Sequence, residues 1–138
     1  MSKKIKAEQL EKVLKEQLTN YLEDIEEDVK DTTDATIKEA RQELIETSPR
    51  SGIARNTKYY KGWSVKAGGR TREKRYYSKV IWNKTNYQLT HLLEFKHHKR
   101  NGTGYVEAQP HIRKVEEKYG TKFADTLETK IKRRSKWH

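Results

Sequence analysis

The feature that most constrains this chain is a run of about forty residues, from 7 to 47, without glycine or proline. The run is rich in Glu, Lys, Leu and Gln, which all favour helix. An unbroken helix of this length would be a rod of about 60 Å, at about 1.5 Å per residue, and one small domain cannot cover it. Its apolar residues recur at steps of three and four, which draws one stripe along the helix: Leu10, Val13, Leu14, Leu18, Tyr21, Leu22, Ile25 and Val29, continued by Ile37, Ala40, Leu44 and Ile45.

The stripe allows two interpretations. It either packs on the sheet of its own chain, or its exposed end pairs with another copy. Residues 31–36, Asp-Thr-Thr-Asp-Ala-Thr, are a weak spot where a kink or a break is expected, because such side chains compete for backbone hydrogen bonds. Ser48 ends the helix, because Pro49 pushes the residue before it out of the helical region.

After a polar loop at residues 50–58, the sequence predicts an antiparallel β-hairpin. Residues 59–66 alternate as in a half-buried strand. Ala-Gly-Gly-Arg at residues 67–70 makes the turn, and residues 72–82 return as the second strand. The tip of this hairpin is basic.

The most hydrophobic stretch of the chain, residues 80–95, continues from the hairpin. It predicts the end of a strand, a capping turn of Asn-Lys-Thr-Asn at residues 83–86, and a short helix with apolar spacing. A basic, glycine-containing loop at residues 96–104 should be exposed. Residues 105–108 then add a short strand.

A C-terminal helix follows, with Pro110 as one of its early residues. Its buried face is marked by residues that step by three or four: Ile112, Val115, Tyr119, Phe123, Leu127 and Ile131.

Together these elements predict an α+β fold in a single domain of residues 1–138. A long acidic N-terminal helix, residues 1–48, packs on a small, mostly antiparallel sheet made of the β-hairpin and a short strand. The basic body, residues 49–138, adds the second short helix and the C-terminal helix.

The core of such a fold must be thin, because 32% of the residues are hydrophobic and 37% are charged. Part of the stability is therefore expected from neighbouring subunits. The residues predicted to build the core are Trp63, Trp82, Tyr87, Leu92, Leu93, Phe95, Ile112 and Val115.

The net charge of +11 is unevenly distributed. Residues 1–49 hold 8 Lys and Arg against 13 Asp and Glu, a net charge of −5, and the remaining residues hold 23 against 7, a net charge of +16. Such asymmetry indicates either a nucleic-acid surface or charge-complementary contact between copies of the chain.

The chain has no cysteine, so it has neither a disulfide framework nor a thiolate metal site. We expect a cytosolic protein without a membrane partner, because we find neither a signal peptide nor an apolar run of spanning length.

The histidines and carboxylates give little support to a metal site or to an enzyme active site. His91, His97, His98 and His111 lack the convergent spacing that zinc requires, so no metal and no cofactor are expected. Glu94 lies three residues after His91, as an acid/base pair of a hydrolase would, but the same spacing gives an ordinary helix-surface pair. Without a nucleophile or phosphate-loop signature, we predict no catalytic residues and no enzyme.

The basic hairpin carries the alternative function, nucleic-acid binding by residues 70–79. Cations interleaved with Tyr76, Tyr77 and Trp82 are typical of surfaces that contact phosphates and bases. Cations on an exposed hairpin also keep its edge from pairing wrongly, so the pattern alone does not decide.

Several short sequence motifs resemble those of a family of tailed-phage proteins, the minor tail-component or head-to-tail joining proteins of long-tailed phages and prophages. The similarity spans about residues 39–117. Two departures are Lys96, where the family usually has glycine, and Lys114, where it usually has proline. The motifs that carry the resemblance are Glu-Thr-Ser-Pro at residues 46–49, Tyr-Lys-Gly-Trp at 60–63, Asn-Lys-Thr-Asn-Tyr-Gln-Leu-Thr-His-Leu-Leu-Glu-Phe at 83–95, Lys-Arg-Asn-Gly at 99–102 and Gln-Pro-His-Ile at 109–112.

The resemblance implies an α+β subunit without enzymatic activity that forms a ring, a hexamer, with itself. Its other partners would be adjoining head-completion or connector proteins and tail-terminator or tail-tube proteins, with non-specific proximity to DNA. Its place would be the virion neck or tail, and the host cytoplasm during assembly. On this interpretation the partner contacts are expected at Arg70, Arg72, Lys74, Arg75, Lys79, Lys96, His97, His98, Lys99 and Arg100.

Overall fold

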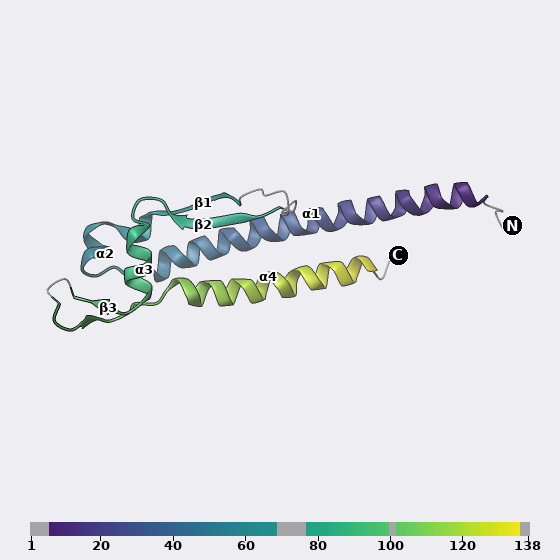
Figure 1. Cartoon of the computed structure of the whole chain (residues 1–138). Helices are drawn as coiled ribbons and strands as arrows, with labels where there is room; N and C mark the ends of the chain where they lie inside the picture. Colours follow the sequence, from purple (N-terminus) through teal and green to yellow (C-terminus); the bar gives the residue numbers. More distant parts are fainter. Residues whose placement is uncertain (1–5, 69–76, 100–101, 136–138) are drawn as a thin grey trace.

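The computed structural model describes the chain except for residues 1–5, 69–76, 100–101 and 136–138. It has the predicted α+β architecture, with a long N-terminal helix, a small antiparallel sheet and a C-terminal helix (Figure 1). The elements in chain order are α1 (Ala7–Thr47), α2 (Ile53–Asn56), the 3-10 helix η1 (Tyr59–Lys61), β1 (Trp63–Ala67), β2 (Lys79–Asn83), α3 (Gln88–Glu94), β3 (His97–His98), β4 (Tyr105–Val106) and α4 (Ile112–Ser135).

Helix α1 is continuous through the predicted weak spot at residues 31–36. Tertiary contacts occupy the side chains that would otherwise compete with the helix. Thr32 is buried and accepts a hydrogen bond from the Lys130 Nζ at 2.9 Å. Asp34 accepts one from the Tyr77 hydroxyl at 2.6 Å. The helix ends at Thr47, and Ser48 before Pro49 is extended, as predicted.

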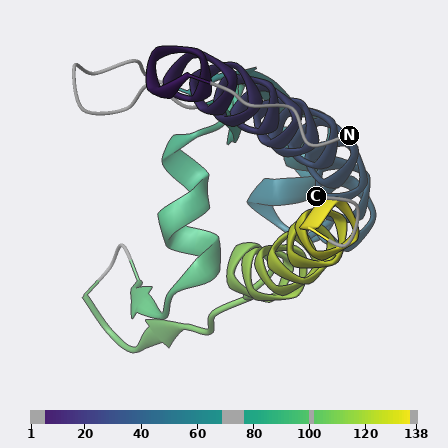
Figure 2. The same ribbon diagram turned by 90° about the vertical axis from the view of Figure 1, so that its right-hand side faces the viewer.

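Helix α4 runs antiparallel to the C-terminal half of α1, and the two lie side by side in both views (Figures 1 and 2). Lys118 pairs with Glu43 at 2.6 Å, and Lys122 pairs with Glu39. At the far end of α4, the Arg134 guanidinium donates two hydrogen bonds to Asp28, at 2.6 and 2.9 Å. The N-terminal part of α1 continues beyond the end of α4 (Figure 1).

The β-hairpin begins later than predicted, and residues 69–76, which hold part of the predicted turn and of the second strand, lie outside the described residues. Strand β1 pairs with β2 in antiparallel register from Trp63 opposite Asn83 to Ala67 opposite Lys79. Residues 59–61, predicted as strand, form η1 instead. Lys58 before them adopts φ = 51°, the left-handed conformation, which turns the chain into that helix.

Three further differences concern the segments after α1. The predicted exposed loop at residues 96–104 contributes β3, which pairs with β4 as a second two-stranded sheet. Helix α4 begins at Ile112, so Pro110 lies before the helix and not within it. The polar loop at residues 50–58 contains the short helix α2.

The core lies where the C-terminal half of α1, the hairpin, α3 and the start of α4 meet. Of the residues predicted for it, Trp63, Leu93 and Val115 are buried, whereas Trp82 and Ile112 are half-buried. The remaining members of the buried core are Ala40, Leu44, Ala54, Tyr59 and Leu89.

The prediction was wrong for three core residues. Tyr87, Leu92 and Phe95 expose 59%, 39% and 55% of their surface. Helix α3 is only seven residues long, and it buries the face that carries Leu89 and Leu93, four residues apart. The other apolar residues of this stretch therefore point to solvent.

Candidate interaction surface

A buried polar junction at the start of α4 joins this helix to the rest of the molecule. Both oxygens of the Glu94 carboxylate accept backbone N–H groups of that helix end. Oε2 accepts from His111 at 2.9 Å and Ile112 at 3.0 Å, and Oε1 accepts from Arg113 at 2.9 Å. A helix leaves its first N–H groups without partners, and a negative charge there also opposes the helix dipole. Glu94, the last residue of α3, therefore caps α4.

The electrostatics of Glu94 agree with this role. Burial alone raises the pKa of its carboxyl, but the three backbone N–H donors and the neighbouring His111 outweigh burial and hold the pKa below its usual value. The carboxylate is thus ionised when it caps the helix.

The His111 ring joins the same junction and lies almost fully buried. Its Nδ1 lies 2.9 Å from the Gln109 carbonyl oxygen, and its Nε2 lies 2.9 Å from the Tyr59 hydroxyl. Burial lowers the pKa of His111, although the Gln109 carbonyl and Glu94 oppose that shift. A neutral ring that donates from Nδ1 and accepts the Tyr59 O–H at Nε2 satisfies this geometry.

Asn83 connects the hairpin to this junction. Its buried side chain donates to the Tyr59 carbonyl at 2.9 Å and accepts the Asn86 N–H at 2.8 Å. Gly62 is required beside it, because a Cβ at that position would lie 2.3 Å from the Asn83 Oδ1. Only glycine at position 62, directly after η1, therefore lets the backbone approach Asn83 this closely.

The C-terminus of α1 is fixed by Trp63. The indole N–H donates to the Ser48 Oγ at 2.7 Å, and the Trp63 carbonyl accepts a hydrogen bond from the Arg41 Nε at 2.9 Å. The Trp63 ring also meets the Tyr59 and His111 rings edge to face, with centroids 5.5 and 6.0 Å apart. One buried cluster thus joins α1, the hairpin, α3 and α4.

The junction is a structural site. In the described part of the chain, no buried side-chain nitrogen or oxygen lacks a hydrogen-bond partner. Glu94 is committed to the α4 backbone, while His91 is exposed and lies against Phe95, with ring centroids 5.0 Å apart. The arrangement of Glu94 therefore explains how α4 begins, and the acid/base hypothesis for His91 and Glu94 finds no support in it.

The first candidate surface is the N-terminal arm, which we define as residues 7–27 of α1. One side of the arm carries an apolar stripe whose members expose 38–58% of their surface. Monomeric proteins rarely expose contiguous apolar patches of this kind unless they bind something there. We call these residues the arm stripe: Leu10, Val13, Leu14, Leu18 and Leu22.

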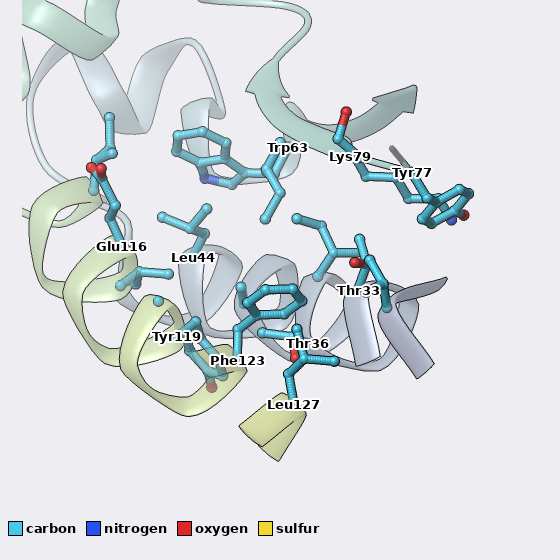
Figure 3. Close-up of a pocket in the computed structure, with 18 residues that line it drawn as sticks. Thr33, Thr36, Leu44, Trp63, Tyr77, Lys79, Glu116, Tyr119, Phe123 and Leu127 are labelled. Carbon is cyan, nitrogen blue, oxygen red and sulfur yellow. The ribbon is translucent and has the colours of Figure 1, made fainter. Parts of the chain in front are cut away.

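The second candidate surface is an apolar groove of about 750 Å³ between α1, the hairpin and α4 (Figure 3). Leu44 and Trp63 line it from α1 and β1, and Tyr119, Phe123 and Leu127 line it from α4 (Figure 3). Seen along the molecule, α1 and α4 form one side of a C-shaped section, with α3 opposite (Figure 2). Apolar lining with few polar groups is typical of a binding groove.

Of the contact residues predicted from sequence, Lys79 lines the groove (Figure 3). Lys79 is half-buried and pairs with Asp34 at 2.7 Å, and the hydrogen bond from that pair raises the pKa of Lys79. Lys96 lies 3.7 Å from Glu107, and Lys99 is exposed beside the β3–β4 turn. His97 and His98 form β3. The other predicted contacts, Arg70, Arg72, Lys74, Arg75 and Arg100, lie outside the described residues.

No helix in the described residues carries an apolar stretch long enough to cross a bilayer. Within the described residues, the buried side-chain polar atoms have hydrogen-bond partners, whereas the arm stripe and the groove are exposed.

Comparison with known families agrees with a structural role. Residues 12–95 match the family described as "Bacteriophage HK97-gp10, putative tail-component". The match covers more than half of the chain, so the protein belongs to this family and is a structural protein of the phage tail. No curated protein and no solved structure matches the chain.

Proposed function

We propose that this chain is a ring-forming subunit that completes the tail or joins it to the head of a tailed phage. The observation that carries the proposal is the arm stripe, which projects on α1 beyond the end of α4. Burying such a stripe stabilises association by about 25 cal/mol per Å² of apolar surface removed from water. A subunit of a virion tail meets copies of itself and neighbouring tail parts, and the stripe suits such contacts.

The charge distribution supports the same role. The arm holds seven acidic and two basic residues, whereas α4 holds eight basic and four acidic residues. Opposite charges on different surfaces of one subunit favour head-to-tail contact between copies. Contacts of that type close into rings when the rotation between subunits allows it.

The proposal is tested by the mass of the assembled species. Leu18→Glu places a charge on the arm stripe, and Lys12→Glu places a glutamate on the opposite side of the helix, where no stripe residue lies three, four or seven positions away. Sedimentation or light scattering of the chain, alone and with portal and tail-tube proteins, should show oligomers that Leu18→Glu weakens by at least about tenfold. Lys12→Glu should assemble like the unchanged chain.

A strictly monomeric chain, even with those neighbours present, would refute the proposal. Tight DNA binding that falls steeply with salt, without self-association, would also refute it and favour the nucleic-acid alternative.

A further inference from the structure

We propose that the arm stripe of one copy docks in the apolar groove of the next copy. This inference rests on the proposed function, because it names the contact through which the subunits associate. It commits to one occupant, the N-terminal arm of a second chain.

The lengths of stripe and groove agree. The groove is lined by residues between 29 and 44 on α1 and between 112 and 127 on α4, so each wall is about 22 Å long at about 1.5 Å per residue. The arm stripe runs from Leu10 to Leu22, about 18 Å on the same scale. A helix laid along the groove would thus bury the whole stripe between the two walls.

The chain's own connectivity excludes self-docking. The arm and one wall of the groove belong to the same unbroken helix, α1. Residues 10–22 could reach residues 29–44 of their own chain only if that helix broke. The arm is therefore available to another molecule, and the groove to another arm.

The chemistry of the two surfaces is complementary. The floor of the groove is apolar, with Ala40, Leu44, Trp63 and Val115 in its lining. An amphipathic helix laid in an apolar groove, with side chains at steps of three and four as anchors, is a common mode of protein recognition. The acidic flanks of the arm would then lie along α4, which holds eight basic and four acidic residues. Lys118, Lys122 and Arg134 already pair with α1 of their own chain, so the attraction comes from the other basic residues of α4. Because stripe and groove differ, the contact is head-to-tail and each copy uses both surfaces.

Cysteine cross-linking tests this contact, since the natural chain has no cysteine. Leu14→Cys lies near the middle of the arm stripe. Gly120→Cys lies near the middle of the α4 wall, where an added Cβ meets no atom within 4 Å. Each variant chain carries one of these substitutions, and the two are co-expressed and oxidised. A disulfide dimer that joins one chain of each kind is expected, and the matched control replaces Leu14→Cys by Lys12→Cys, two residues away on the opposite side of the arm, which should give at least about tenfold less dimer.

The other outcomes overturn the proposal in distinguishable ways. Efficient cross-linking of Leu14→Cys to itself would show that two arms pair with each other. Oligomers without the mixed disulfide would show that another surface, or another virion protein, uses the groove, and the proposed function would survive. Absence of oligomers altogether would remove both proposals.

A second test fills the groove without disturbing the fold. Gly120→Trp places a large ring in the open space, whereas Gly120→Ala removes only the flexibility of glycine inside α4. Both variants should keep the circular dichroism of the folded chain. Only Gly120→Trp should lose self-association, by at least about tenfold. Equal assembly of the two variants would overturn the docking proposal.

Discussion

Replacing Glu94 by glutamine tests whether this single side chain holds α4 to the body. In the folded protein the carboxylate accepts three backbone N–H groups, at 2.9, 3.0 and 2.9 Å. Glutamine has one accepting oxygen, and its amide group is a donor. At least one N–H of the helix start would therefore face another donor.

The cost can be worked from these contacts. A buried donor without an acceptor costs about 1–3 kcal/mol, and the lost charge at the helix end adds about 0.3–1 kcal/mol. We expect Glu94→Gln to lower the free energy of unfolding by about 1–4 kcal/mol. With a urea dependence of about 2 kcal/mol per molar, the unfolding midpoint should fall by about 0.6–2 M.

Urea unfolding followed by circular dichroism measures this change. The matched control is Glu117→Gln, an exposed residue of α4 that pairs with Arg113 at 3.0 Å. The control should change stability by less than about 0.5 kcal/mol. Equal effects of the two substitutions would refute the capping argument, as would an unchanged midpoint for Glu94→Gln.

The pH dependence gives an independent check. The pKa of Glu94 is lower in the folded protein than in the unfolded chain. Its contribution is therefore fully present above the unfolded value of about 4.3 and is lost as the pH falls through the lower folded value. Glu94→Gln should flatten the stability curve in that acidic window.

Three further predictions concern other members of the same framework. The pKa of His111 is lower when folded, so stability should fall as the pH drops below about 6.5, and urea titrations of His111→Gln should lack that part of the slope. Ser48→Ala removes the acceptor of the buried Trp63 N–H and should cost about 1–3 kcal/mol in the same assay. Asp28→Asn weakens the two-bond contact with Arg134, so amide exchange should quicken in the last turns of α4 while global unfolding changes less.

The sequence could predict those helices and strands whose ends are set by neighbouring residues. The bounds of α1 follow from the Gly- and Pro-free run and from the Ser48–Pro49 stop. Its continuity through residues 31–36 could not be predicted, because contacts from Lys130 and Tyr77, far along the chain, decide it. The start of β1 was predicted too early, since alternation over residues 59–66 does not show that Lys58 turns the chain into a 3-10 helix.

The buried polar junction and the groove were harder to predict from the sequence. Asn83, Glu94 and His111 were interpreted as a turn residue, a surface carboxylate and a weak metal candidate. A stronger signal of their role was that these polar residues stand next to apolar ones. A polar side chain that is buried there requires a hydrogen-bond partner. Their actual partners are backbone groups of other elements, and spacing alone does not identify these. The groove likewise depends on how far α4 stands from the hairpin.

The Glu94 cap also has a consequence for the segment between α3 and α4. The Gln109 N–H donates to the Leu93 carbonyl at 2.7 Å, and Glu94 holds the next residues, so the two ends of residues 95–108 are fastened together at their base. Changing the length of a loop whose ends are already joined alters its closure entropy only slowly, by about 0.6 kcal/mol per doubling. The length of the segment between α3 and α4 can therefore change at little cost to the helical frame that carries it.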